Sequence, residues 1–258
     1  MFYVTNKDKI VSVAIALSTV LVLFLLAATF KSQSTEKSIQ TSANASKLLP
    51  IYNVETEENK VALTINCAWN AEDIDLILET LSKNEAKATF FMVGDWAAKF
   101  PDAVKKIYES GNEIANHSES HSHVNNLNYE KNVEEITKCS DRIKSITGKS
   151  TTLYRGPYGE YNDTVVKAAK DCNHIMIQWN IDSLDYKGLT GEQMWDRIKA
   201  KLDKGSIILM HNGTENTALS LNMIIKNIKE KGYSLVTVSD LIYKENYTID
   251  NNGVQHGN

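Results

Sequence analysis

The sequence predicts an α/β fold in which parallel strands alternate with helices. Short apolar runs that suit buried strands occur at 61–65, 88–93 and 207–210. Between such runs, apolar residues recur at helical spacing, as at Ile74 and Ile77. Strands that are separated by helices pair in parallel, with the helices outside the sheet. About seven strands are expected, which leaves a barrel and an open sheet as candidate architectures.

The expected elements follow this alternation along the chain. In the longest expected helix, 129–146, Val133, Ile136 and Ile143 face inward. Strands are expected at 61–65, 88–93, around Ile114, and at 153–154, 175–179, 207–210 and 234–238. Helices are expected at 74–81, 103–110, 129–146, 163–169, 192–202 and 221–231.

The N-terminal part reads as a membrane anchor. Residues 10–30 form an almost unbroken apolar run without charge, and about 20 such residues span a bilayer. Lys7 and Lys9 precede the run and favour a cytoplasmic segment 1–9. A cleaved signal peptide is the alternative, although 27–30 is a poor cleavage pattern. Both interpretations place the remainder outside the cytoplasmic membrane.

Composition divides the remainder into three parts. Residues 31–60 are polar and are expected to form a flexible linker, with 50–52 beginning to dock on a folded domain. The domain is expected to cover 61–244, and 245–258 is expected to fray as a tail. The net charge is −4 and no stretch concentrates Lys and Arg, which argues against a nucleic-acid partner.

The cysteine count gives no disulfide framework. The chain has three cysteines, so at least one thiol is free. Cys139 and Cys172 are interpreted as ordinary helix or core residues, because free cysteine is among the most buried residue types.

A histidine pair indicates a candidate metal site. His117 and His121 are four residues apart, which can direct both imidazoles at one divalent ion on a helical turn or compact loop. This spacing alone is a weak signal.

Further polar residues follow the later strands. His211 closes an apolar run and suits a general acid, which Asp185 can orient and stabilise in its charged form. Arg155 lies in the loop 154–159, where a backbone N–H such as that of Tyr158 can face an oxyanion. The alternatives are a structural histidine, a helix-capping aspartate and a rigid connector.

Taken together, these motifs resemble the polysaccharide deacetylase family, the NodB-homology domain of carbohydrate esterase family 4. The resemblance covers about 61–243 and includes Leu-Thr-Ile-Asn-Cys at 63–67, His-Ser-Glu-Ser-His at 117–121 and Leu-Met-His at 209–211. It implies a distorted (β/α) barrel and a Zn2+-like ion that holds water against the N-acetyl group of a sugar polymer.

The resemblance also implies roles for individual residues. His117 and His121 match the two histidine ligands, and Arg155 matches the arginine that positions the catalytic base. The N–H of Tyr158 matches an oxyanion donor. Asp185 and His211 match the pair that protonates the departing amine.

The first motif departs from the family pattern Thr-Phe-Asp-Asp-Gly. Asn66 stands at the position of the base, and Cys67 stands at the position of the third metal ligand. An amide cannot accept a proton from water, whereas a thiolate is a good zinc ligand. The sequence therefore predicts that metal binding can survive where catalysis is impaired.

Three hypotheses follow from these residues. The first is a membrane-anchored, metal-dependent deacetylase of peptidoglycan or a related N-acetylglucosamine polymer, with Asp182, Glu119 or a metal-bound hydroxide in place of the base. The second is a catalytically impaired protein on the same scaffold that binds or organises cell-wall glycan. The third and weakest is a Cys67 nucleophile with a histidine partner.

Overall fold

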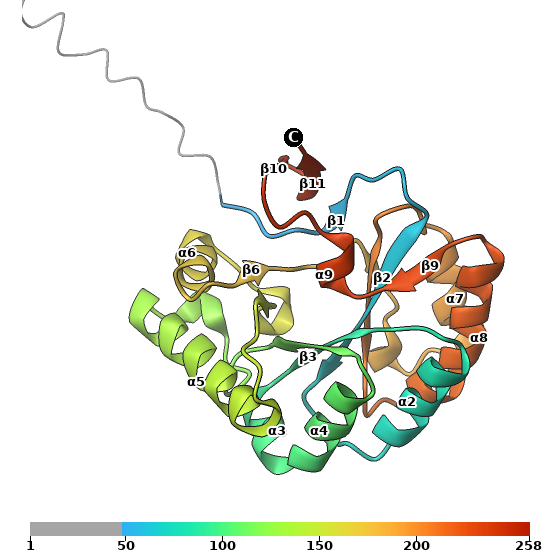
Figure 1. Ribbon diagram of the computed structural model, residues 1–258, viewed down its shortest axis with the longest axis horizontal. Coiled ribbons are helices and arrows are strands. Elements are labelled where there is room, and N and C mark those ends of the chain that lie inside the picture. The colour runs from blue at the N-terminus through green and yellow to red at the C-terminus, as the bar shows by residue number, and fades with distance from the viewer. Residues whose placement is uncertain (1–47) are drawn as a thin grey trace, which may run out of the picture. The chain divides into compact units, whose positions relative to one another are not determined.

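The protein is described by a computed structural model that covers residues 48–258. Its centre is a curled sheet in which every strand pair is parallel (Figure 1). The strand order is β6-β5-β4-β3-β2-β8-β7, and β9 pairs with β2. The strands are β2 (Lys60–Cys67), β3 (Thr89–Met92), β4 (Glu113–Asn116), β5 (Leu153–Tyr154), β6 (Ile175–Met176), β7 (Ile181–Asp182), β8 (Ile207–His211) and β9 (Ser234–Val236). The predicted parallel α/β fold is confirmed, and its sheet has β6 and β7 as its two ends.

Helices cover the outer side of this sheet (Figure 1). They are α2 (Ile74–Lys83), α3 (Gly94–Lys99), α4 (Pro101–Glu109), α5 (Tyr129–Thr147), α6 (Asp163–Asp171), α7 (Gly191–Lys199) and α8 (Thr217–Glu230). The short helix α9 (Val238–Leu241) instead places Val238 and Leu241 in the same cluster as Ala62, on the other side of the sheet. All six predicted helices are present. The short helices α3 and α9 were not expected, because four to six residues are too few to show helical periodicity.

Local sequence signals set the ends of the helices. The Asn128 side chain accepts a hydrogen bond from the backbone N–H of Lys131 and caps α5, which ends at Gly148 in a left-handed conformation. Thr190 and Gln193 form a reciprocal capping box at the start of α7.

Strand β2 separates two layers of the core. Leu63, Ile65 and Cys67 belong to the cluster that packs between the sheet and the helices. Ala62 belongs to the inner cluster, on the concave side of the sheet. Because side chains alternate along a strand, Asn66 faces the inner side and its neighbour Cys67 faces the helices.

The segments at both ends of the described chain are ordered, which corrects the predicted linker boundary and the predicted frayed tail. Strand β1 (Asn53–Val54) pairs in parallel with β11 (Val254–Gly257), and β10 (Tyr247–Ile249) pairs with β11 in the antiparallel sense. Ile51 is buried and bridges to Ile177, so the expected docking of 50–52 is confirmed. This small sheet holds because it buries apolar side chains and Gln255, whose amide donates to the carbonyl of Tyr243.

The expected anchor at 10–30 lies outside the described residues. Within 48–258, no helix is long and apolar enough to cross a membrane.

The contact between Gly205 and β1 gives a stability prediction. Gly205 has φ +74°, and an added Cβ would lie 1.7 Å from the carbonyl oxygen of Val54. Gly148 has φ +73° with nothing within 4 Å of such an atom, so it is a matched control for backbone strain alone. We expect Gly205→Ala to lower the free energy of unfolding by at least about 2 kcal/mol more than Gly148→Ala. Urea unfolding of both variants measures the difference, and equal losses would contradict the close approach.

Candidate active site

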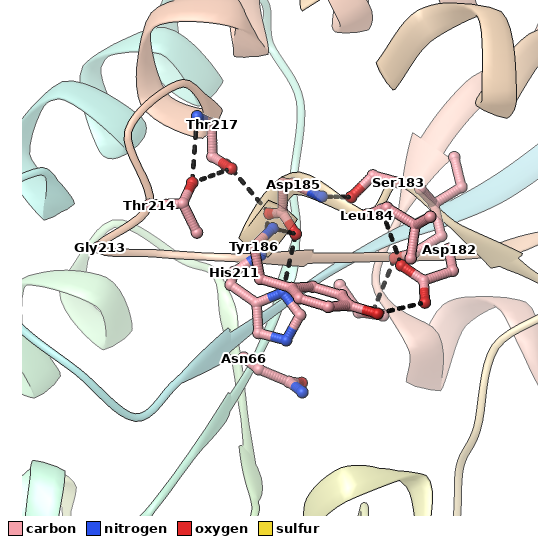
Figure 2. A network of polar contacts seen from close by, with 12 residues as sticks. Asn66, Asp182, Ser183, Leu184, Asp185, Tyr186, His211, Gly213, Thr214 and Thr217 are labelled. Carbon is pink, nitrogen blue, oxygen red and sulfur yellow. Dashed lines mark hydrogen bonds and ion pairs between the residues drawn. The ribbon is translucent and has the colours of Figure 1, made fainter. Parts of the chain in front are cut away.

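The polar residues singled out above lie at the carboxyl ends of the strands. Asn66 is the last inward-facing residue of β2, His117 directly follows β4, and Arg155 directly follows β5. Asn66 and His211 are register partners in the parallel pair β2–β8. Their side chains therefore lie on the same side of the sheet, and Figure 2 shows the Asn66 amide next to the imidazole ring of His211.

Arg155 is fully buried beneath this site. Its Nη1 donates to Thr64 Oγ1 and to Asn66 Oδ1, both at 2.9 Å. Its Nη2 donates to the carbonyl of Gln178 at 3.0 Å, and its guanidinium lies 4.0 Å from the ring centroid of Phe91. Every one of these acceptors is neutral, and burial lowers the pKa of Arg155 to about 9. The guanidinium is therefore a buried cation that hydrogen bonds satisfy without an opposite charge.

The contact with Arg155 fixes the orientation of the Asn66 amide. A guanidinium only donates hydrogen bonds, so the oxygen of Asn66 must face it. The amide nitrogen then points away from Arg155 and makes no hydrogen bond with any described residue. The base position thus presents N–H donors where a carboxylate would present acceptors.

The predicted histidine ligands lie side by side. Their ring centroids are 5.1 Å apart, and His117 Nδ1 lies 2.7 Å from the carbonyl oxygen of Arg155. As the donor in that contact, Nδ1 leaves Nε2 with a free lone pair, which is the usual way a ligating histidine is held. Burial lowers the pKa of His117, and the neighbouring His121 lowers it further. Burial also lowers the pKa of His121, and there the neighbouring His211 adds to the effect. Both imidazoles are consequently suited to bind a metal in their neutral form.

Cys67 does not join these histidines, which corrects the predicted ligand set. Its side chain is buried in the apolar layer against the helices, and burial together with Asp73 raises the pKa of its thiol. Within residues 48–258, no group of three or more His, Cys, Asp or Glu side chains could hold a metal ion. A catalytic zinc ion usually has three protein ligands, so His117 and His121 form an incomplete zinc site. The buried thiol also argues against a Cys67 nucleophile.

Asp185 and His211 form the predicted pair. Asp185 is fully buried, and its Oδ1 lies 2.9 Å from His211 Nδ1. Its Oδ2 accepts from the backbone N–H of His211 at 2.6 Å and from Thr217 Oγ1 at 2.7 Å (Figure 2). The pair holds the ring so that Nε2 is free, which is the arrangement that a general acid requires.

Neither carboxylate considered as a substitute base is free. The side chain of Glu119 is ion-paired with Arg142. Asp182 Oδ1 accepts from the backbone N–H of Leu184 at 2.8 Å, and its Oδ2 lies 3.5 Å from the hydroxyl of Tyr186. Both carboxylates therefore have structural partners.

Exposed aromatic rings surround the histidines. Trp69 lies 5.4 Å from the ring of His211, and Tyr186 lies 5.3 Å from it. Tyr158 has φ 59° and its ring stacks on His123 at 4.2 Å, with His121 at 4.6 Å. The role of the Tyr158 N–H as an oxyanion donor stays a prediction. Trp69 was missed by sequence reasoning, although an aromatic residue so close behind the first motif was a usable signal.

Glu135 on α5 was also missed, and it holds the histidine loop. Its Oε2 accepts from Ser118 Oγ at 2.5 Å and from the backbone N–H groups of Glu119 and Ser120 at 3.1 and 2.9 Å. Burial alone would raise the pKa of Glu135, but the hydrogen bonds from Ser118 and Ser120 leave it lowered overall. Nothing in the helical spacing of α5 distinguishes this glutamate from its neighbours.

Glu135 gives a pH-dependent prediction. Its folded pKa is lowered, so its contribution to stability is present above the unfolded carboxyl pKa of about 4.3 and is lost as the pH falls through the folded value. We expect Glu135→Gln to lower the free energy of unfolding at pH 7 by about 1 kcal/mol, after allowance for partial exposure. The deficit relative to wild type should disappear in acid. Urea unfolding between pH 3 and 7 measures it, with the exposed Glu245→Gln as a control; a deficit that does not depend on pH would contradict the assignment.

Arg155 gives a third stability prediction. Asn66→Asp supplies the buried guanidinium with a carboxylate at hydrogen-bond distance, so we expect the free energy of unfolding at pH 7 to rise by about 1–2 kcal/mol. Arg155 should hold the pKa of the new carboxyl low, so the gain is lost below about pH 4. Thermal unfolding at pH 7 and pH 3 tests this, with Asn252→Asp as the same change elsewhere. A destabilised Asn66→Asp variant at pH 7 would refute the idea that Arg155 lacks a counter-charge.

Comparison with known proteins agrees with this geometry. The family described as polysaccharide deacetylase matches residues 53–177. The uncharacterized protein YlxY of Bacillus subtilis is 33% identical over 75% of this chain, and the match spans 60% of that protein. A peptidoglycan-N-acetylglucosamine deacetylase of Bacillus cereus is 31% identical over 70% of this chain and 68% of its own length.

Solved structures add a pseudoenzyme to these relatives. A family 4 carbohydrate esterase pseudoenzyme from Bacillus anthracis superposes with a TM-score of 0.73 at 31% identity, covering 81% of this chain and 73% of that one. A mutant of it, described as having restored enzymatic activity, gives a TM-score of 0.72 at 33% identity, with 74% and 70% covered. The chain belongs to the polysaccharide deacetylase family, whose members include both deacetylases and a pseudoenzyme.

Proposed function

We propose that this protein binds an N-acetylated cell-wall glycan and does not hydrolyse it at a rate typical of a deacetylase. One observation carries the proposal: the amide of Asn66 occupies the base position and its oxygen is engaged by Arg155. Deacetylation needs a group that takes a proton from the attacking water, and an amide has no usable basicity. Loss of a general base typically costs about 10² to 10⁴ in rate.

The ligand set supports the same proposal. His117 and His121 provide two nitrogens, and Cys67 faces the helices instead of the cleft. Without a third protein ligand, a water-activating zinc ion is held less firmly than in a deacetylase that has all three.

The surface around the histidines suits sugar binding. The rings of Trp69, Tyr158 and Tyr186 are each about half exposed around one region. Aromatic faces of this kind offer large, rigid apolar contact area to a ligand at low entropic cost. The Bacillus cereus relative named above is a peptidoglycan-N-acetylglucosamine deacetylase, and we extend that substrate class to this chain as the bound glycan.

The proposed location follows from the sequence. Residues 10–30 would anchor the chain in the cell membrane, with the domain 61–244 outside the cytoplasm, where cell-wall glycan is found.

Slow metal-dependent deacetylation is a second candidate function. The specific observation in its favour is the intact Asp185–His211 pair, which is arranged to protonate a departing amine. A Zn2+ ion would then be required, and within residues 48–258 the cleft offers His117 and His121 as its ligands.

Acetate release separates the two candidates. We expect purified full-length protein, supplied with zinc and with chitin oligomers or peptidoglycan, to release no acetate above background. Asn66→Asp should raise the release at least about 100-fold, because it restores a carboxylate beside Arg155. His117→Ala in the Asn66→Asp background should abolish the gain. Acetate release by the wild type that Asn66→Asp leaves unchanged would establish the second candidate instead.

Glycan binding is measured on the same preparation. We expect isolated wall material to retain the wild-type protein, and Trp69→Ala to reduce retention several-fold through loss of an aromatic contact surface. Leu219→Ala is the control, because Leu219 is an apolar residue on α8 that is more exposed than Trp69. Recovery of nothing on the wall material would contradict glycan binding.

A further inference from the structure

A short stretch of chain holds the curled sheet together at its edge. Residues 51–55, called here the closing segment, contact both end strand β6 and the residues that lead into β8. The backbone N–H of Ile51 donates to the carbonyl of Met176 at 2.9 Å. The backbone N–H of Val54 donates to the carbonyl of Gly205 at 3.0 Å. Because end strands β6 and β7 do not pair with each other, the closing segment links parts of the sheet that strand pairing leaves apart.

Gln178 connects the closing segment to the cleft. Its backbone N–H donates to the carbonyl of Ile51 at 2.7 Å, and its own carbonyl accepts from Arg155 Nη2 at 3.0 Å. Gln178 is 2% exposed, and its side chain donates to the carbonyl of Gly159 at 2.9 Å, next to Tyr158. Loss of the contact with Ile51 would therefore loosen a residue that supports both Arg155 and the loop of Tyr158.

His256 fastens the closing segment to the hairpin of β10 and β11. Its Nδ1 lies 2.6 Å from Glu55 Oε2, and its Nε2 lies 3.5 Å from Asp250 Oδ2. Ionised carboxylates only accept hydrogen bonds, and a neutral imidazole can donate from one nitrogen only. Both carboxylates therefore face a donor only when the ring of His256 carries two protons and a positive charge.

The groups around His256 make it the cation of this contact. Glu55 reaches it from the closing segment and Asp250 from the turn between β10 and β11, and within residues 48–258 neither forms an ion pair with a lysine or an arginine. On β10 its register partner is the uncharged Thr248, and the hydroxyl of Tyr243 donates to the backbone carbonyl of Glu55 at 3.1 Å. The hydrogen bond with Glu55 is the largest effect that raises the pKa of His256. Stabilisation by a group whose folded pKa is raised is fully present below its ordinary value, about 6.5 for histidine, and is lost as the pH rises through the folded value.

We propose that His256 is a pH-sensitive clasp on the closing segment. Protonated His256 holds the closing segment against the hairpin of β10 and β11. When the ring loses its second proton, the closing segment loosens and Gln178 loses part of its support. The pH then controls how firmly Arg155 and the loop of Tyr158 are held at the cleft. This device acts on the fold and does not depend on whether the cleft binds or hydrolyses a glycan.

Hydrogen–deuterium exchange of the full-length protein at pH 6 and pH 8.5 tests the clasp. After correction for the intrinsic effect of pH on exchange, we expect protection of the peptides that contain Val54 and Gln178 to fall at least about threefold at the higher pH. His256→Gln and Glu55→Gln each remove one side of the contact and should make this protection low at both pH values. Glu57→Gln is the matched control, because the side chain of Glu57 is fully exposed nearby and does not contact His256. Exchange of α8 is the internal reference for an intact fold.

The outcomes separate the clasp from its connection to the cleft. Equal protection of Val54 at both pH values in the wild type, or a pH dependence that His256→Gln and Glu55→Gln both retain, overturns the clasp itself. A loss of protection at Val54 with unchanged exchange at Gln178 and around Tyr158 overturns the connection to the cleft. A parallel loss of protection in α8 shows global unfolding instead of local opening, and it also contradicts the clasp.

Discussion

Buried Arg155 organises the floor of the cleft through both its guanidinium group and its backbone carbonyl. Its side chain joins Thr64 and Asn66 on β2 to the carbonyl of Gln178, beyond β6 at the far edge of the sheet. Its own carbonyl meets the ring nitrogen of His117 and sets which nitrogen of that ring is free. One residue therefore connects central strand β2 to the chain that follows edge strand β6, and it orients a candidate ligand. Removal of its side chain would leave several buried acceptors unpaired, which is costly in free energy.

The alternation of side chains along β2 has a comparably large effect on which residues can act as base or metal ligand. Asn66 and Cys67 are adjacent, yet one faces the cleft and the other faces the helices. The same alternation that buries Leu63 and Ile65 against the helices carries Cys67 with them. A ligand role for Cys67 would need the end of β2 to twist out of that apolar layer. The thiol instead behaves as a small apolar side chain.

Much of the fold could be predicted because its signals are local. Apolar runs located the central strands, and helical spacing located α2, α4, α5, α6, α7 and α8. The positions of Asn66, Arg155 and His211 at strand ends followed from the rule that such ends meet at one edge of a parallel sheet. The side to which Cys67 points was within reach of the same reasoning, because the strand pattern places it in register with Ile65.

Other features depend on contacts that no local pattern records. The pairing of β1 with β11 joins residues about 200 positions apart, and the polar composition of both segments is typical of loops. Glu135 acts on the histidine loop across the space between α5 and β4, so its function is visible only in three dimensions. The same holds for Arg155, whose lack of an opposite charge becomes apparent only once every acceptor around it is known.

Replacement of a catalytic aspartate by asparagine is the change that disturbs this architecture least. Asparagine has nearly the shape of aspartate and keeps an oxygen for Arg155, so the hydrogen bond at 2.9 Å can persist while the charge disappears. The aromatic rings and the Asp185–His211 pair do not depend on that charge for their positions. The side chains around the cleft can therefore keep their positions without a charged base at position 66, although the proton acceptor for hydrolysis is absent.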